Sequence, residues 1–303
     1  MVIQYFSYQQ INKQKWDDCI SNAGNGLIYG YSVYLDTMAY CWDALVLNDY
    51  EVVMPLTWNK KFGIYYLYQP FCTAALGLFG NNITAGMVND FLEAIPAKFK
   101  YWDIYLNHKN LFHLKDFELY ERSNYTLALN APYEKLFAGF GTNLKQSIKK
   151  SEQLNCSVRK NIDVKEVIAL AKEQSKRFSP ATGEDYRRFE ALYRKLHAQE
   201  KAITYGVYSS SNQLLASCIL FFSHNRMYYI LAGNHPKGKP AGASHALINA
   251  FIKAHAEQDI LLDFEGSDVP SLAFFYSRFG STIEKYPGMK RNRLPAIVKL
   301  FKK

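Results

Sequence analysis

The sequence predicts a mixed α+β (α/β) protein made of two tandem domains, each with a mixed, mostly antiparallel central sheet flanked by helices. Its 303 residues suffice for two domains of ordinary size, each with its own core. Apolar residues make up 49% of the chain and aromatic residues 16%, a composition that excludes disorder. The order of the expected elements also repeats along the chain, with corresponding elements about 160 residues apart.

The repeat consists of two helices, an apolar hairpin, a third strand, a loop, a helix and a short strand. In the first half these elements are expected at residues 13–21, 32–40, 42–48, 51–58, 63–69, 70–82, 84–98 and 101–106. In the second half they are expected at residues 164–178, 184–199, 202–208, 213–222, 227–233, 234–242, 244–258 and 260–265. Mixed chains often repeat a hairpin and a helix by chance, but the shared order and offset favour duplication.

The segment between the two repeats is expected to hold a strand at residues 125–129 and one helix at residues 133–153. We therefore expect the domain boundary near residue 145. This divides the chain into an N-terminal domain of residues 1–145 and a C-terminal domain of residues 146–303, and the second carries the predicted active-site cleft.

Charge, cysteine usage and missing motifs narrow the classes of function. The net charge of +9 and the pI of about 9.1 favour anionic ligands such as nucleotide phosphates, transfer RNA or anionic lipid headgroups. Five scattered cysteines and seven dispersed histidines fit neither a disulfide framework nor a metal site, so we expect no metal. Neither a signal peptide nor a run of roughly 20 apolar residues is visible, so we expect a cytoplasmic protein without a membrane span. Nicotinamide, ATP and serine-hydrolase chemistry are disfavoured because their glycine-rich or GxSxG motifs are missing.

A glycine-rich loop in the second half is the first candidate site. It follows the expected third strand and leads into a helix that starts near Ser244. Unpaired amides at a helix N-terminus and the helix dipole together favour an anion such as a pyrophosphate. An ordinary strand-to-helix loop, kept soluble by its lysines, explains the same residues. The candidate cofactor-binding residues are Gly233, Asn234, Lys237, Lys239, Gly242, Ala243 and Ser244.

Two carboxylates follow on the next expected strand, residues 260–265. Strand alternation places Asp263 and Glu265 on one face, where they need partners or a wet cleft. A partly buried carboxylate at the C-terminal end of a strand could accept a proton from an attacking amine, because burial raises its pKa. For Glu265 this catalytic role and a capping or salt-bridging role both stay open. For Asp263 we expect a structural role.

Tyr276 lies near the end of the next expected helix. This helix has start signals at Ser267, Asp268 and Pro270 and a stop signal at Gly280. A phenol at this position could protonate a departing thiolate, and packing against the sheet is the alternative role.

These pieces resemble the acyl-CoA N-acyltransferase fold of the Gcn5-related N-acetyltransferases (GNAT). In that superfamily a Gln/Arg-x-x-Gly-x-Gly/Ala loop enters a helix, and residues 239–244 (Lys-Pro-Ala-Gly-Ala-Ser) are similar to it. Residues 271–280 (Ser-Leu-Ala-Phe-Phe-Tyr-Ser-Arg-Phe-Gly) resemble the later Asn-x-x-Ala-x-x-Leu-Tyr-x-x-x-Gly-Phe helix, without its asparagine. The resemblance implies Tyr276 as general acid, the amides of residues 242–244 as a pyrophosphate cradle, and acyl-CoA as donor.

The chain as a whole resembles the FemABX proteins, which carry two such domains. The supporting segments are residues 63–79, 123–129, 133–151 and 263–267. Familiar FemABX enzymes attach amino acids from aminoacyl-tRNA to cell-wall precursor peptides, so the resemblance implies amide formation and a role in cell wall biogenesis. A heptad stretch for the long helical arm of some members is missing from the sequence.

We therefore expect an acyl- or aminoacyl-transferase that forms an amide on a small-molecule or peptide amine, with acyl-CoA or aminoacyl-tRNA as the donor. The donor is expected between residues 229–233 and 262–265, where strand amides polarise its carbonyl. A non-catalytic protein of the same fold that binds an anionic lipid or a cell-wall precursor is the alternative, whereas an RNA-binding module would need grouped stacking aromatics. Several basic residues could contact the backbone of a transfer RNA, and a solvated helix face and an ordinary charged tail explain them as well. These residues are Lys145, Lys149, Lys150, Arg159, Lys160, Lys299, Lys302 and Lys303. The sequence leaves the acceptor and the oligomeric state open.

Overall fold

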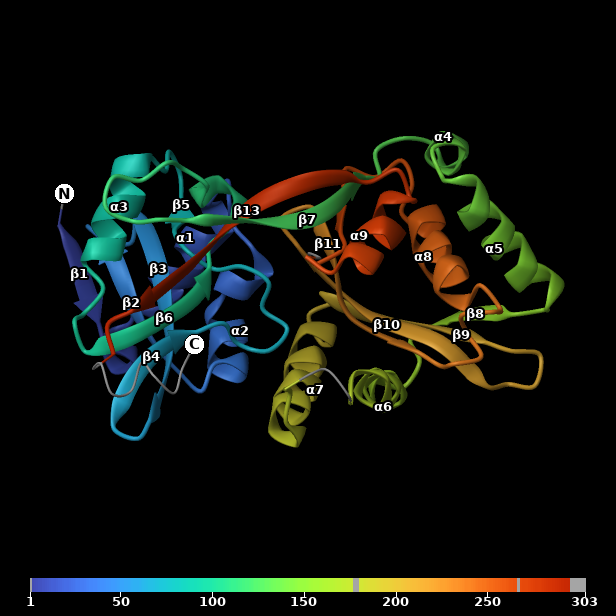
Figure 1. The fold of residues 1–303 in the computed structure, drawn as a ribbon, viewed down its shortest axis with the longest axis horizontal. Helices are drawn as coiled ribbons and strands as arrows, with labels where there is room; N and C mark the ends of the chain where they lie inside the picture. Colours follow the sequence, from blue (N-terminus) through green and yellow to red (C-terminus); the bar gives the residue numbers. More distant parts are fainter. Residues whose placement is uncertain (1, 177–179, 266–267, 295–303) are drawn as a thin grey trace. The chain divides into compact units, whose positions relative to one another are not determined.

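The computed structural model describes residues 2–176, 180–265 and 268–294, which form two compact units (Figure 1). Unit 1 comprises Met1–Ser123 and the described residues 285–294, and unit 2 is Asn124–Glu284. The predicted division at residue 145 falls inside helix α5 (Thr142–Gln153), which packs as one piece against helix α8 (Ala243–Ala254) of unit 2. In the structure the division lies within strand β7 (Tyr120–Ala128), and the end of the chain returns to unit 1, which a linear repeat does not anticipate.

Unit 1 is built on a mixed sheet with the strand order β1-β2-β3-β4-β6-β13. Neighbouring strands are antiparallel, except that β4 and β6 run parallel. Its elements in chain order, with η for 3-10 helices, are β1 (Ile3–Phe6), η1 (Tyr8–Gln10), α1 (Lys13–Asn22), η2 (Ile28–Gly30), α2 (Ser32–Met38), β2 (Cys41–Leu47), β3 (Val52–Lys61), β4 (Ile64–Tyr68), β5 (Phe79–Gly80), α3 (Ala85–Glu93), β6 (Phe99–Tyr105), η3 (His108–Asn110) and the later part of β13 (Thr282–Asn292).

The core of unit 1 forms because its central strands are apolar almost without interruption. Six of the seven residues of β2 are buried, as expected for a strand covered on both faces. Helix α3 adds Val88, Phe91 and Leu92, whose spacing of three and four residues puts them on one helical face. The Thr84 hydroxyl accepts a hydrogen bond from the Met87 amide at 3.3 Å and so caps the start of this helix.

The strands of unit 2 follow the order β7-β12-β11-β10-β9-β8. The neighbours are again antiparallel except for one parallel pair, β11 and β12. Helices α6 and α7 cover one face of this sheet, and α5 and α8 cover the other (Figure 1). The elements after β7 are α4 (Tyr133–Ala138), α5, β8 (Ser157–Lys160), α6 (Val164–Ser175), α7 (Gly183–His197), β9 (Ala202–Tyr208), β10 (Leu214–Ser223), β11 (Arg226–Asn234), α8, β12 (Leu261–Asp263), α9 (Pro270–Ser277) and the start of β13.

The predicted fold class is confirmed, because each unit has a mixed sheet flanked by helices. The prediction of one helix over residues 133–153 is wrong, since α4 and α5 are separate helices. Gly139 ends α4 and Gly141 begins α5, with Phe140 buried between them. Glycine favours such an interruption because it costs little to leave the helical conformation.

Two other differences concern the end of the chain. Strand β13 was not predicted, because Pro287 and Gly288 lie in its middle and both residues are uncommon inside strands. The predicted helix start at Ser267 lies outside the described residues, and α9 begins at Pro270, where proline suits the first helical turn.

Candidate active site

The two parallel strands of unit 2 pair over only a short distance. Residues 226–228 of β11 pair with residues 261–263 of β12, and there β12 ends. Strand β11 continues to Asn234 and stays paired with β10 along its other edge. From Tyr229 onward, the edge of β11 that faced β12 therefore has no strand partner among the described residues of unit 2. Backbone groups on such an edge are available to hydrogen-bond a ligand.

The corresponding parallel pair in unit 1, β4 and β6, is closed by the protein itself. Beyond the paired residues, the Gln69 side chain accepts a hydrogen bond from the Tyr105 amide at 3.1 Å. The Leu76 amide donates to the Tyr105 carbonyl, and the Asn107 amide donates to the Leu76 carbonyl, both at 2.8 Å. The loop after β4 thus fills this position and leaves a cavity of about 10 Å³, enough for one water molecule. Of the two parallel strand pairs, that of unit 2 is therefore the one with an open edge.

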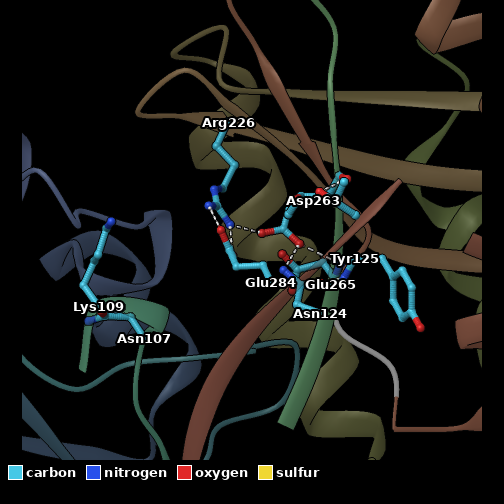
Figure 2. Close-up of polar contacts among 10 residues, drawn as sticks. Asn107, Lys109, Asn124, Tyr125, Arg226, Asp263, Glu265 and Glu284 are labelled. Atoms are coloured by element: carbon cyan, nitrogen blue, oxygen red, sulfur yellow. Dashed lines mark hydrogen bonds and ion pairs between the residues drawn. The ribbon is translucent and has the colours of Figure 1, made fainter. Parts of the chain in front are cut away.

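A buried ionic cluster holds the end of β12 in place (Figure 2). Arg226 donates to Asp263 at 2.5 Å and makes two hydrogen bonds to Glu284 at 3.0 and 2.9 Å. The second carboxylate oxygen of Asp263 accepts from the Asn124 side chain and from the Glu265 amide, each at 2.8 Å. Burial opposes the charge of Arg226, but the two carboxylates outweigh it and raise the pKa of the guanidinium. Asp263 therefore has the structural role that the sequence predicted.

Glu265 lies two residues beyond this anchor, in a conformation that few residues adopt. Its φ of +64° is in the left-handed region, which is strained for a residue other than glycine. The predicted alternation of Asp263 and Glu265 along one strand is wrong, because β12 ends at Asp263 and the backbone turns. The Glu265 side chain is half-buried.

Tyr276 lies on α9 and packs beside the open edge. Its ring stacks on Phe264 with centroids 4.8 Å apart and meets the edge of Tyr229 at 6.4 Å. Burial, together with the negative charge of Glu265, raises the pKa of the Tyr276 phenol well above its ordinary value of 10. At neutral pH the phenol is therefore protonated and can donate a proton.

The predicted anion loop joins β11 to α8, but most of its amides already have partners. The Gly242 amide donates to the Lys239 carbonyl at 3.1 Å, and the Ala243 amide donates to the Gly238 carbonyl at 3.0 Å. The Asn234 amide donates to the Gln174 side chain at 2.6 Å. Of the three amides predicted to cradle a pyrophosphate, the described residues leave that of Ser244 for a ligand.

Some residues of this loop contact the rest of unit 2, and others face solvent. The Ser244 hydroxyl donates to the Asn234 side chain, which joins the end of β11 to the start of α8. Gly233 packs against the backbone of α6, where a larger residue would not fit. Lys237 and Lys239 are exposed to solvent. The loop therefore offers to an anion two lysine charges and, of the three amides predicted as the cradle, only that of Ser244 among the described contacts.

Gly242 is expected to tolerate no larger residue. Its φ is +69°, and an added Cβ would overlap the Ser147 carbonyl oxygen of α5. We expect Gly242→Ala to lower the free energy of unfolding by about 3 kcal/mol, from backbone strain and overpacking together. Gly183→Ala is the matched control, because that site has an ordinary φ and no neighbour within 4 Å of the added Cβ. Equal urea denaturation midpoints for the two variants would contradict this account of the loop.

The basic residues that the sequence offered as an RNA contact lie on two elements of unit 2. Lys145, Lys149 and Lys150 are on α5, and Arg159 and Lys160 are on the exposed edge strand β8. The Lys145 ammonium donates to the Ala138 carbonyl at 2.9 Å, and the Arg159 guanidinium lies 4.1 Å from the Tyr208 ring centroid. The predicted C-terminal members, Lys299, Lys302 and Lys303, lie outside the described residues.

Sequence reasoning missed three residues of the site: Asn124, Arg226 and Glu284. One signal was available, because a carboxylate on an apolar strand needs a cation and Arg226 stands at the start of another apolar strand. No local pattern marks the other two, since they approach the site through the tertiary structure.

Two further observations bear on ligands. Within residues 2–176, 180–265 and 268–294, no group of three or more His, Cys, Asp or Glu side chains is placed to hold a metal ion. Among the helices of the same ranges, none is both long and apolar enough to cross a membrane.

Comparison with known proteins yields matches in structure only. Neither a protein-family model nor a curated protein sequence matches the chain. The structure of FemX matches with a TM-score of 0.68 at 13% identity, covering 100% of both chains. The structure of L-PGS from Bacillus licheniformis matches with a TM-score of 0.57 at 11% identity, covering 95% of this chain and 94% of that one. A GCN5-related N-acetyltransferase from Sphaerobacter thermophilus matches with a TM-score of 0.50 at 9% identity, covering 97% and 96%. At these identities the likeness concerns the fold, and the chain has a FemABX/GNAT-like fold, as its sequence predicted.

Proposed function

We propose that unit 2 transfers an acyl or aminoacyl group from an activated donor to the amine of an acceptor and so forms an amide. The observation that carries this proposal is the open edge of β11 from Tyr229 to Asn234, which leads into the loop before α8. An extended donor can lie along such an edge with its carbonyl against strand amides, which stabilise the negative charge that develops during attack. The closed counterpart in unit 1 supports unit 2 as the reacting unit.

The residues beside the edge suit a direct transfer. The acceptor nitrogen attacks the donor carbonyl, a carbon–nitrogen bond forms, and the bond to the leaving oxygen or sulfur breaks. Glu265 would take the proton released by the amine, and the protonated phenol of Tyr276 would supply a proton to the leaving atom. Much of the rate would come from holding donor and acceptor together, because their binding in the correct orientation removes the entropy cost of bringing them together in the reaction step.

One observation favours an oxygen ester over the thioester of coenzyme A as the donor. Of the three amides predicted to cradle the pyrophosphate of coenzyme A, those of Gly242 and Ala243 are hydrogen-bonded to carbonyls of the loop. Aminoacyl-tRNA is therefore the first donor class in this proposal and acyl-CoA the second.

The test offers both donor classes to the full chain with lysine-containing peptides as amine acceptors. We expect amide product from pooled aminoacyl-tRNA, detected by transfer of radiolabelled amino acid to peptide. Binding of acetyl-CoA and of aminoacyl-tRNA is measured in parallel by titration calorimetry. Lys239→Ala is expected to weaken the binding of the phosphate-bearing donor about fivefold, and Lys253→Ala, at the far end of α8, serves as the control.

Each outcome of this test supports a different donor or a different function. Transfer from acetyl-CoA alone, with binding weakened by Lys239→Ala, would make acyl-CoA the donor. Binding without transfer from either donor would support the alternative, a non-catalytic protein of this fold that holds an anionic lipid or a cell-wall precursor. No binding and no transfer would overturn the proposal.

A further inference from the structure

The hairpin that joins β3 to β4 in unit 1 projects beyond the rest of its sheet (Figure 1). The strands pair up to Lys61 and Ile64, so Phe62 and Gly63 alone form the turn. Both turn residues have positive φ values, +50° and +79°, which defines the tight turn that suits the twist of a hairpin. Asparagine followed by glycine is the pair that favours this turn.

Phe62 is unfavourable at this position for two reasons. A bulky side chain rarely adopts a positive φ, so the turn is strained where asparagine would relieve it. The ring is also 92% exposed and gains almost nothing from packing within the chain. Phe62 therefore strains the backbone and exposes an apolar ring at the tip of the hairpin. A contact between this ring and a surface outside the chain would explain both features.

The charges around the tip indicate what that contact is. Lys60 and Lys61 are exposed and precede the ring, and the Lys61 ammonium lies 5.6 Å from the Phe62 ring centroid. Residues 52–68, which form both strands and the turn, contain no aspartate or glutamate. The aromatic residues nearest the tip, Trp58 and Tyr65, are half-buried against the core of unit 1, so Phe62 is the ring that the tip exposes. An apolar tip with lysines behind it matches an anionic lipid surface, where the ring enters the acyl boundary and the cations meet the headgroups.

We propose that the β3–β4 hairpin of unit 1 is a contact for anionic lipid membranes, with Phe62 inserting and Lys60 and Lys61 binding headgroups. This contact is independent of the transfer reaction. One inserted ring and two lysines make a weak, reversible contact, because stable attachment needs more buried apolar surface than one ring provides.

The test measures binding of the full chain to vesicles of phosphatidylglycerol and phosphatidylcholine, by sedimentation at low ionic strength. We expect Phe62→Asn to weaken binding about tenfold or more, since the apolar ring is lost. The same change is expected to leave the melting temperature unchanged or raise it, because Asn-Gly suits the turn. Lys60→Gln and Lys61→Gln are each expected to weaken binding about fivefold, and pure phosphatidylcholine should bind poorly.

Phe274→Asn is the matched control, because Phe274 is another exposed phenylalanine, 67% accessible, on α9 of unit 2. It should bind vesicles like the unmodified chain. Phe62→Trp gives a direct readout: its added fluorescence should shift to shorter wavelength on vesicles and be quenched by brominated acyl chains. Equal binding by Phe62→Asn and the unmodified chain, or loss of binding with Phe274→Asn alone, would overturn the proposal. Failure to bind vesicles of either composition would also overturn it and would point to a protein surface as the partner of the tip.

Discussion

Replacing Tyr276 by phenylalanine is expected to lower kcat roughly 10²- to 10³-fold with the donor that the protein uses. The phenol is buried against Phe264 and Tyr229, and its raised pKa keeps it protonated, so it can serve as the proton donor in the proposed transfer. The phenylalanine ring keeps the packing and removes only that donor. Steady-state kinetics with radiolabelled donor measure the effect, and donor binding should change little.

Tyr205→Phe is the matched control for this prediction. Tyr205 is another buried phenol of unit 2 whose pKa burial raises to about 12, but it lies on β9, which β10 separates from β11. The control should retain most of the activity. Because a raised pKa means that the proton is lost only above the ordinary value of 10, the rate should show no decline between pH 7 and 9 from ionisation of Tyr276. An unchanged kcat in Tyr276→Phe would mean that this residue only packs against the sheet.

Arg226→Met is expected to lower the free energy of unfolding by about 3–5 kcal/mol, because it leaves two carboxylates without their cation. Arg226 and Asp263 are 9% and 4% exposed, so water cannot compensate fully for the lost ion pair. Asp263 also receives hydrogen bonds from Asn124 and the Glu265 amide. The loss should therefore disturb Glu265 and lower the transfer rate as well. Urea denaturation measures the first effect and the transfer assay the second.

Lys285→Met provides the control for a broken ion pair. Lys285 pairs with Glu121 at 2.6 Å in unit 1, but both side chains are more than half exposed, at 55% and 56%. Exposed pairs contribute at most about 1 kcal/mol, since water and salt screen them. Suppose that Arg226→Met lowered the free energy of unfolding no more than Lys285→Met. The buried ionic cluster would then not anchor the end of β12.

The helices and strands with strong periodicity were predictable from the sequence. Residues 202–208 were predicted as a strand and form β9, and the strands predicted at residues 213–222 and 227–233 match β10 and β11 to within a residue at each end. Local apolar patterns suffice here because these strands and the helices beside them bury one continuous core. Strand β13 escaped prediction because its pairing with β6 is long-range and overrides the usual preferences of Pro287 and Gly288.

The candidate site was predictable only in part. Glu265 and Tyr276 were recognised as catalytic candidates from the sequence, and in unit 2 Glu265 follows the end of β12 and Tyr276 lies on α9. The structural role of Asp263 also followed from one physical rule, that a buried carboxylate needs partners. The identity of those partners did not follow, because Asn124, Arg226 and Glu284 lie far from Asp263 in sequence.

The sequence by itself determined the class of fold, the order of its strongly periodic elements and the polar residues available for chemistry, because these depend on periodicity and composition. Only the tertiary structure decided which parallel strand pair is open. Leu76 and Gln69 close the pair in unit 1, whereas among the described residues of unit 2 no strand pairs with this edge of β11 beyond Tyr228. The tertiary structure also decided that most amides of the loop before α8 are hydrogen-bonded within the protein. Both outcomes depend on which backbone groups find partners, and backbone groups are the same in every residue except proline, so side-chain patterns cannot reveal their pairing.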